Sequence, residues 1–477
     1  MEEVLLDFNQ RTEKYIDLGG FKVSPDHKIL AYSVDLEGSE KYSIFFKVLE
    51  TGEILENETI TNTSGSINWS SDSKHVWYSV LDDIHRPHKV FRHSLGLKTE
   101  DALVYHEKDP KFYAGMSLSM SKEYLFCYSV SSLTSEYSFL KTSEPTSELK
   151  LIKKRVAGHR YNVEHQGSRF LIQDNGAKKY LNYRLCSAPI EEPENWQEVI
   201  PYNPLIEIEE VVPFKNFIAL AERTEGMVKI KIMKAQNGII DEAAFTHYIG
   251  IKQELYSAFI NGYAELNYDS SILRYTYSTP ISDKKVVEYD MSSKTEKVLK
   301  EQTIPGSFDP SKYTLKRIYC PIEKENKVDS IFGTPVPDSV PISLIYRNDM
   351  YKGDGSNPCY LYGYGSYGIS IDASWSSSKI SLIDRGFVFA IAHIRGGGDC
   401  GKGLIWSFSF LITTFRVAWY EVGKFKHKKN TFLDFNACAK YMISEKYTNP
   451  TKLAIEGRSA GGLLIGATLN LDPSLYA

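Results

Sequence analysis

The sequence predicts two domains, an all-β domain over residues 1–305 and an α/β domain over residues 306–477. Two observations predict this division. Turn-and-strand units recur through residues 1–305, where long helical patterns are absent. Beyond them, continuous apolar segments alternate with helical patterns, as is typical of a parallel sheet covered by helices.

The units of the first domain each join a turn rich in Ser, Asp and Lys to a short alternating strand. Their steps are roughly 45 to 55 residues, the period of propeller blades with four strands each. Six visible units and one degenerate blade therefore predict a seven-bladed β-propeller, with an array of β-sandwiches as the alternative. The units lie at 23–35, 69–82, 118–132, 165–176, 212–223 and 266–278.

The second domain begins with two segments, 313–322 and 340–349, that alternate like antiparallel strands. Three continuous apolar runs, 358–366, 386–394 and 452–457, are typical of buried parallel strands. Between the last two, residues 430–447 have apolar side chains at helical spacing, and Thr431 with Asp434 predicts a capping box at the start of that helix. This pattern predicts an α/β sheet, which we expect to be incomplete in this chain.

Composition argues against several classes of function, namely nucleic-acid binding, metal binding and membrane association. A formal net charge of −4 and a pI near 6.3 give no reason to expect nucleic-acid binding. Six cysteines without a C-x-x-C pair are typical of a reducing compartment and offer no zinc pattern, so we expect a cytoplasmic protein with no metal. The acidic N-terminus is no signal peptide. The apolar core at 404–415 is shorter than the roughly 20 residues that span a bilayer, so no membrane association is expected.

The pentapeptide Gly-Arg-Ser-Ala-Gly at 457–461 has the G-x-S-x-G pattern of a nucleophile elbow. An apolar strand precedes it and a helical segment follows, which is the context that such an elbow requires. Ser459 would be the nucleophile, and the backbone N–H of Ala460 would point at the developing oxyanion. A glycine-rich turn with an incidental serine is the alternative.

Five segments together resemble the prolyl oligopeptidase family of serine peptidases. They are LYGYGSYG (361–368), AIAHIRGGG (390–398), WYEVGK (419–424), KNTFLDF (429–435) and EGRSAGGLL (456–464), and the variants present are most similar to the oligopeptidase B branch. The resemblance implies a seven-bladed propeller joined to an α/β-hydrolase domain, with Ser459 as the nucleophile. It implies that the hydroxyl of Tyr364 donates to the oxyanion beside the Ala460 N–H. It also implies peptide substrates, no cofactor, and a monomer or weak dimer.

Oligopeptidase B enzymes cleave after Arg or Lys, and Asp372 matches an acidic position associated with binding basic side chains. Where a second acid often follows in the family, this chain has Ser374. The bland alternative for Asp372 is a solvated loop residue, and for Tyr364 a buried tyrosine bonded to backbone. Two other functions stay open, an esterase or acylaminoacyl-type hydrolase and a propeller-based peptide-binding pseudoenzyme.

The chain also departs from the family. No histidine follows Ser459, and the only acid after it is Asp472. His393 could in principle act as the base, but its matching position in the family is not catalytic. The resemblance therefore implies a chain that is truncated at both ends and lacks the general base and the acid that orients it, so we expect it to be inactive or nearly so.

Seventeen residues, 402–418, separate Gly401 from Trp419, where the family has about three. The aromatic and aliphatic bias of 403–417 favours a retained intron or a misplaced exon boundary. A genuine insertion that forms a hydrophobic loop or a partner site is the alternative.

Overall fold

The computed structural model describes residues 3–10, 12–203, 206–224, 226–235, 240, 245–262, 266–304, 306, 308–323, 327, 330–331, 334–335, 337–400 and 419–477. The unusual segment at 403–417 therefore lies outside the described residues. The chain divides into two compact units. One comprises Met1–Ala177 and Cys186–Gln197, and the other comprises Lys178–Leu185 and Glu198–Ala477.

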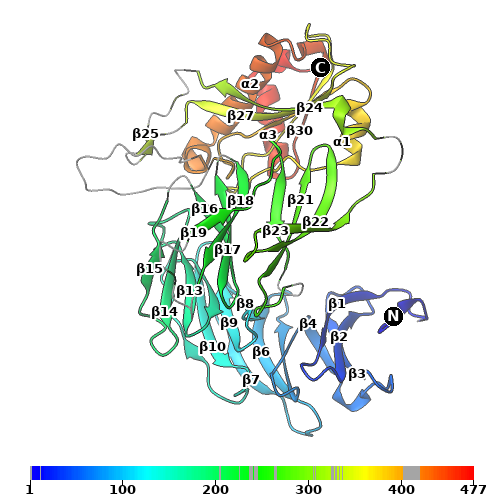
Figure 1. Ribbon diagram of the computed structural model, residues 1–477, viewed down its shortest axis with the longest axis vertical. Helices are drawn as coiled ribbons and strands as arrows, with labels where there is room; N and C mark the ends of the chain where they lie inside the picture. The colour runs from blue at the N-terminus through cyan, green and yellow to red at the C-terminus, as the bar shows by residue number, and fades with distance from the viewer. Residues whose placement is uncertain are drawn as a thin grey trace. The chain divides into compact units, whose positions relative to one another are not determined.

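The first unit consists of antiparallel sheets (Figure 1). Its first sheet contains β1 (Asp17–Val23), β2 (Ile29–Asp35), β3 (Tyr42–Val48), β4 (Ile60–Trp69), β5 (His75–Leu81), β6 (Pro87–Ser94) and β7 (Ala102–His106), in that order. The second contains β8 (Tyr113–Leu118), β9 (Tyr124–Val130), β10 (Ser135–Lys141) and β11 (Lys150–Leu151). A third sheet, which the division between the units crosses at the start of β14 and within β15, contains β12 (Tyr161–Gln166), β13 (Arg169–Asp174), β14 (Arg184–Pro189) and β15 (Gln197–Ile200).

Strand β4 belongs to two sets of strands at once. Its beginning pairs with β3 through Tyr42 and Thr63, and its pairing with β5 runs from Thr63 with Val80 to Trp69 with Val76. The register of the β4–β5 pairing shifts between Thr63 and Ile67, where Gly65 has a φ of 86° that only glycine adopts without strain. The seven-stranded sheet is therefore two blade-sized sets joined by one strand.

Two further four-stranded sheets belong to the second unit. They contain β16 (Glu207–Pro213), β17 (Phe217–Thr224), β18 (Met227–Lys234) and β19 (Phe245–Tyr248), and then β20 (Ser257–Ile260), β21 (Ile272–Thr279), β22 (Ser282–Asp290) and β23 (Thr295–Glu301). With these, the described strands form six blade-sized sets, and a seventh, degenerate blade stays a prediction.

Each of the six units found in the sequence corresponds to the second strand of a set, namely β2, β5, β9, β13, β17 and β21. These strands have neighbours on both sides, and most of their side chains are buried, as in β2 and β17. A strand buried on both faces carries the densest apolar signal, which is why the sequence shows these strands most clearly.

The α/β sheet has the order β24 (Tyr313–Pro321), β27 (Ser339–Arg347), β29 (Val388–Ala392), β28 (Cys359–Gly363) and β30 (Leu453–Glu456). Strands β28, β29 and β30 are parallel, whereas β24 pairs antiparallel with β27, and β27 with β29. All five predicted strands are thereby confirmed. A separate pair, β25 (Ser330–Ile331) and β26 (Thr334–Pro335), precedes β27. The predicted domain boundary at residue 305 lies between β23 and β24.

Helices cover both faces of this sheet (Figure 1). Alternate residues of its strands, such as Leu361 and Ala390, pack with Phe435 of α2 (Lys429–Ser444) and Leu464 of α3 (Ala460–Leu471). The opposite face, including Phe389, packs with Ile380 of α1 (Ser377–Ile383). Among the described helices, none is long and apolar enough to cross a membrane.

The helix predicted at 430–447 is confirmed as α2, but its capping box is wrong. Thr431 donates its hydroxyl to the carbonyl oxygen of Gly423 instead of capping the helix. The buried Asp434 accepts hydrogen bonds from the backbone N–H (3.0 Å) and Nε (2.8 Å) of Arg395, and a third from its terminal nitrogen. Both residues bond to other elements because the first turn of α2 lies inside the protein.

Replacing Asp434 by Asn should lower the free energy of unfolding by about 3–5 kcal/mol, because Arg395 would remain buried without a charged partner. Urea unfolding of the variant and the parent measures this. The matched control is Asp472→Asn, which breaks the more exposed ion pair with Lys440 and should cost about 0–1 kcal/mol. Equal losses in the two variants would contradict a structural role for the buried pair.

Glu210, beside a bulge in β16, has a pH-sensitive carboxyl group. The register shifts between Ile208 and Glu210, so that Glu209 is the extra residue. Burial, and then the charge of Glu209, raise the pKa of Glu210 from its ordinary 4.5 to about 7. A pKa raised by folding stabilises the native state below the unfolded pKa, and this contribution is lost as the pH rises through 7.

Glu210→Gln should therefore gain stability relative to the parent between pH 5 and pH 8, because glutamine carries no charge at either pH. Urea midpoints at the two pH values measure the difference. The exposed Glu148→Gln serves as the control and should show no such trend. A constant difference between Glu210→Gln and the parent would refute the assignment.

Candidate active site

Ser459 lies at the sharp turn between β30 and α3. Its φ of 53° and ψ of −117° are strained for a residue with a side chain. The turn needs the glycines around it, because a Cβ on Gly457 would collide with the carbonyl of Gly461. Ser459 is exposed, so the elbow presents its hydroxyl rather than burying it. The strained turn has the form that the G-x-S-x-G pattern predicts.

The start of α3 supplies backbone donors beside Ser459. Ala460 is the first residue of the helix, so its N–H has no partner within the helix. The following N–H groups, of Gly461 and Gly462, bond to the carbonyls of Arg458 (2.7 Å) and Ser459 (2.8 Å). The helix terminus adds partial positive charge at this position, which favours an anion.

Tyr364 lies against the first turn of α3. It directly follows β28, which pairs in parallel with β30, so the carboxyl ends of the two strands lie at the same edge of the sheet. A Cβ built on Gly461 would be 3.5 Å from Cδ2 of the Tyr364 ring. The structure therefore brings Tyr364 and Ala460 together beside the elbow, and the half-buried ring is not enclosed in the core.

A role for Lys428 was not predicted from the sequence, although it supports the loop between Tyr364 and α1, which we call the Tyr364 loop. From the residue before α2, its Nζ donates to the carbonyl oxygen of Gly365 (2.6 Å) and to Oγ of Ser366 (2.8 Å). Burial lowers the pKa of this ammonium group to about 8.

Asp372 has hydrogen-bond partners in several elements. Its carboxylate accepts hydrogen bonds from Arg223 of β17 (2.7 Å) and from the hydroxyl of Ser257 of β20 (3.1 Å). Its side chain is 27% exposed. Asp372 is thus an ion-paired residue at the contact with two propeller sheets, not the solvated loop residue of the bland alternative. A role in substrate binding stays a prediction.

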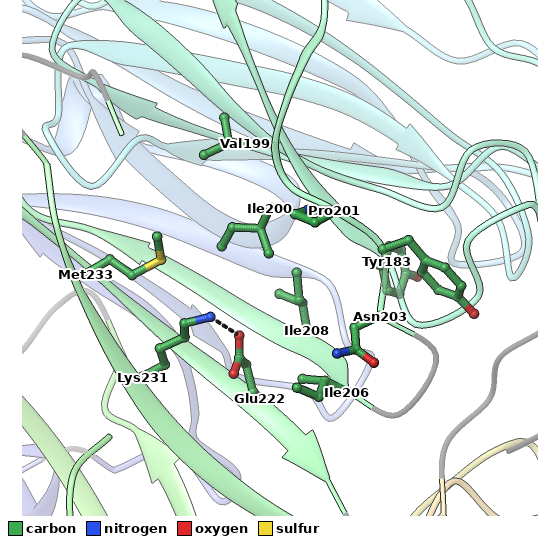
Figure 2. A pocket seen from close by; sticks show the side chains of 11 residues that line it. Tyr183, Val199, Ile200, Pro201, Asn203, Ile206, Ile208, Glu222, Lys231 and Met233 are labelled. Carbon is green, nitrogen blue, oxygen red and sulfur yellow. Dashed lines mark hydrogen bonds and ion pairs between the residues drawn. The ribbon is translucent and has the colours of Figure 1, made fainter. Parts of the chain in front are cut away.

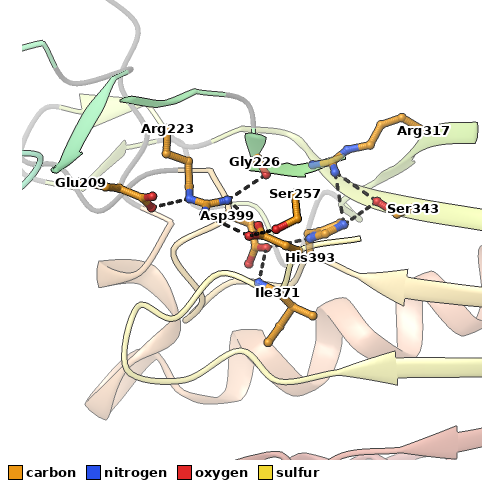
Figure 3. Close-up of polar contacts among 10 residues, drawn as sticks. Glu209, Arg223, Gly226, Ser257, Arg317, Ser343, Ile371, His393 and Asp399 are labelled. Atoms are coloured by element: carbon orange, nitrogen blue, oxygen red, sulfur yellow. Dashed lines mark hydrogen bonds and ion pairs between the residues drawn. The ribbon is translucent and has the colours of Figure 1, made fainter. Parts of the chain in front are cut away.

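His393 lies at the same sheet edge but is fully occupied (Figure 3). Nδ1 is 2.7 Å from Asp399, and Nε2 is 2.8 Å from Oγ of Ser343 and 3.2 Å from Arg317. Burial and the charge of Arg317 lower the pKa of His393. Because a guanidinium group only donates, Nε2 accepts the hydrogen bond from Arg317. This Asp–His–Ser series resembles a proton relay, yet all three residues are buried, so His393 is not available to take a proton from Ser459.

A cavity of about 380 Å³ lies elsewhere, on the sheet of β16–β19 (Figure 2). Its two charged side chains, Glu222 and Lys231, pair with each other at 3.3 Å, and Glu222 also accepts from the hydroxyl of Tyr248. The rest of its wall is largely apolar: Val199, Ile200, Pro201, Ile206, Ile208 and Met233. None of the predicted site residues lines it.

Comparisons with known proteins match this architecture. A model described as the N-terminal beta-propeller domain of prolyl oligopeptidase matches residues 1–302, and the prolyl oligopeptidase family model matches residues 374–477. Protease 2 of Moraxella lacunata is 31% identical over 100% of this chain and 64% of its own length. Dipeptidyl aminopeptidase BI of Pseudoxanthomonas mexicana is 32% identical over 100% of this chain and 61% of its own length.

Solved structures agree. Oligopeptidase B from Leishmania major superposes with a TM-score of 0.85 at 30% identity, and oligopeptidase B from Trypanosoma brucei with covalently bound antipain at 0.84 and 32%. Each match covers 99% of this chain but 63% of the solved chain, so the chain spans less than two thirds of these relatives. The predicted propeller and α/β-hydrolase folds are confirmed, and the chain belongs to the prolyl oligopeptidase family.

Proposed function

We propose that this chain carries the acylation site of a serine peptidase that acts on short peptides, with Ser459 as its nucleophile. The observation that carries the proposal is the strained, exposed Ser459 between β30 and α3. A serine held this way is presented to an incoming carbonyl group, whereas an incidental serine in a glycine-rich turn has no reason to be strained.

In the proposed reaction, Oγ of Ser459 attacks the carbonyl carbon of the scissile peptide bond. Negative charge develops on the carbonyl oxygen, where the N–H of Ala460 and the hydroxyl of Tyr364 donate hydrogen bonds. The C–N bond then breaks, the amine product leaves with a proton, and the acyl part of the peptide stays on Ser459 as an ester. Water then hydrolyses the ester. No step requires a metal or an organic cofactor.

The proton of the Ser459 hydroxyl must pass to a general base. In α/β-hydrolases this base is a histidine that follows the serine in the sequence, after an acidic residue. The 477 residues contain no histidine after Ser459, and His393 is already bonded at both ring nitrogens. We therefore propose that this chain by itself turns over peptides slowly or not at all, because oxyanion stabilisation alone retains only a small part of such catalysis.

The proposed substrates are peptides with Arg or Lys before the cleaved bond. The similarity to two oligopeptidase B structures supports this class, and the acidic net charge of −4 is compatible with cationic substrates. All six cysteines are free thiols, which fits the reducing cytoplasm that we propose as the location. The resemblance to the family supports a monomer or weak dimer.

A fluorophosphonate, which phosphonylates a serine hydroxyl held beside oxyanion donors, tests the acylation site without requiring turnover. Because this chain supplies no general base for Ser459, labelling should be slow, so it is followed over hours at high reagent concentration. Intact mass spectrometry should detect one adduct on the parent chain and none on Ser459→Ala. Tyr364→Phe should slow labelling about 10²-fold by removing one oxyanion donor. The matched control is Tyr367→Phe in the same loop, which is 73% exposed and should label at the parent rate. Labelling that persists in Ser459→Ala would place the nucleophile elsewhere.

Substrate preference can be measured without turnover. A peptide aldehyde that ends in arginine should protect Ser459 from the fluorophosphonate at about a tenfold lower concentration than the same aldehyde ending in norleucine. Tenfold corresponds to about 1.4 kcal/mol, a modest value for one charge recognised by the protein. Equal protection would reject the basic preference while leaving the nucleophile in place.

A further inference from the structure

We infer that Arg223, a residue of propeller strand β17, is a positioning residue for Tyr364. It acts through Asp372, which lies in the same loop as Tyr364. The inference rests on the proposed role of Tyr364 at the oxyanion. Through this contact, a propeller sheet would influence the geometry of the sheet edge where Tyr364 and Ser459 lie.

Arg223 bridges the two sides of this contact. Its side chain is 7% exposed, and its Nε donates to Glu209 of β16 at 2.6 Å. One terminal nitrogen donates to Asp372 (2.7 Å) and to the carbonyl of Gly226 (3.1 Å), and the other donates to Asp372 at 3.5 Å. The planar guanidinium group therefore donates to one carboxylate in a propeller sheet, that of Glu209, and to one in the loop after Tyr364, that of Asp372. The single ammonium group of a lysine could not do this.

The loop between Tyr364 and α1 contains no helix or strand, so its conformation depends on tertiary bonds. Near Tyr364, it is held by Lys428 at Gly365 and Ser366. Its far end is held at Asp372, and at Ile371, whose N–H donates to Asp399 at 3.0 Å.

The propeller hairpin fits closely over this far end (Figure 3). A Cβ on Gly226 would be 2.6 Å from the guanidinium group of Arg317 and 3.1 Å from the carbonyl oxygen of Asp399. Asp399 in turn holds both Ile371 and His393. The buried His393 thus has a structural role. It helps to orient the carboxylate of Asp399, which accepts from Ile371 of the loop, next to Asp372, which accepts from Arg223.

Without Arg223, the carboxylates of Glu209 and Asp372 would lose their shared cation and repel each other. The loop would then be held by Lys428 at one end, by the Gly368 N–H on the carbonyl of Gly396 in the middle, and by Asp399 and Ser257 at the other end, without the ion pair between the domains. Because a displacement of about 1 Å in a catalytic group can reduce the rate by about 10²-fold, a loosened loop should affect the Tyr364 donor before it affects the fold.

Hydrogen exchange of the loop tests the positioning without requiring activity. In Arg223→Met, the amides of residues 364–376 should exchange about tenfold faster or more than in the parent. Asp372→Asn, a milder change on the other side of the same pair, should have the same direction of effect. The matched control is Arg274→Met, which breaks the ion pair of Arg274 with Glu288 in the neighbouring sheet and should leave the loop unchanged.

A double-mutant cycle on the fluorophosphonate labelling rate of Ser459 tests whether Arg223 acts through Tyr364. Arg223→Met should slow the maximal labelling rate about tenfold, with little change in the concentration at half-saturation. In the Tyr364→Phe background it should have little further effect, since the donor that it positions is already gone. A merely structural role would give effects that multiply.

Unchanged loop exchange in Arg223→Met, an equal change in Arg274→Met, or multiplying effects in the cycle would each overturn the inference. Failure of the proposed function is distinguishable, because it would appear as no labelling of Ser459 in the parent chain, and loop exchange would still report on the contact with Arg223.

Discussion

The parallel pairing of β28 with β30 is the constraint on which the site depends. These strands are separated by about ninety residues of sequence, yet their register aligns Leu361 with Ile455 and Tyr362 with Glu456. Residues that directly follow the two strands must then share one edge of the sheet. Tyr364 and Ser459 therefore reach the same place through backbone hydrogen bonding, before any contact between their side chains is considered.

Around this edge, the protein places buried polar groups that hold loops rather than carry out chemistry. Arg395 and Asp434 fix the loop after β29 to α2, and Asp399 with His393 fixes the loop after β28. Such groups are costly to bury unless their hydrogen bonds are made. This free-energy cost is offset here because such groups fix a loop at the end of a parallel strand, which has no backbone ladder to define its conformation.

The sequence separation of the interacting residues decides which parts of the fold and of the site could be predicted. The six blade-sized sets and the five sheet strands were predictable, because buried strands carry local apolar patterns, and the elbow was predictable because strand, glycines and helix are contiguous. The partners of the Tyr364 loop were not. Arg223 is 149 residues from Asp372, and Lys428 is 63 residues from Gly365, so no local pattern links them. The capping box failed for a related reason, since Thr431 and Asp434 have tertiary partners that compete with the cap.

The continuity of strand β4 determines how the first two blade-sized sets unfold. Repeat proteins often lose their modules one at a time, because neighbouring modules share side-chain contacts but no backbone pairing. Here one continuous strand pairs with β3 at its beginning and with β5 from Thr63 to its end. The first two blade-sized sets cannot separate without breaking main-chain hydrogen bonds. They should therefore open as a single cooperative unit, a foldon of seven strands, where a propeller of independent blades would fray blade by blade.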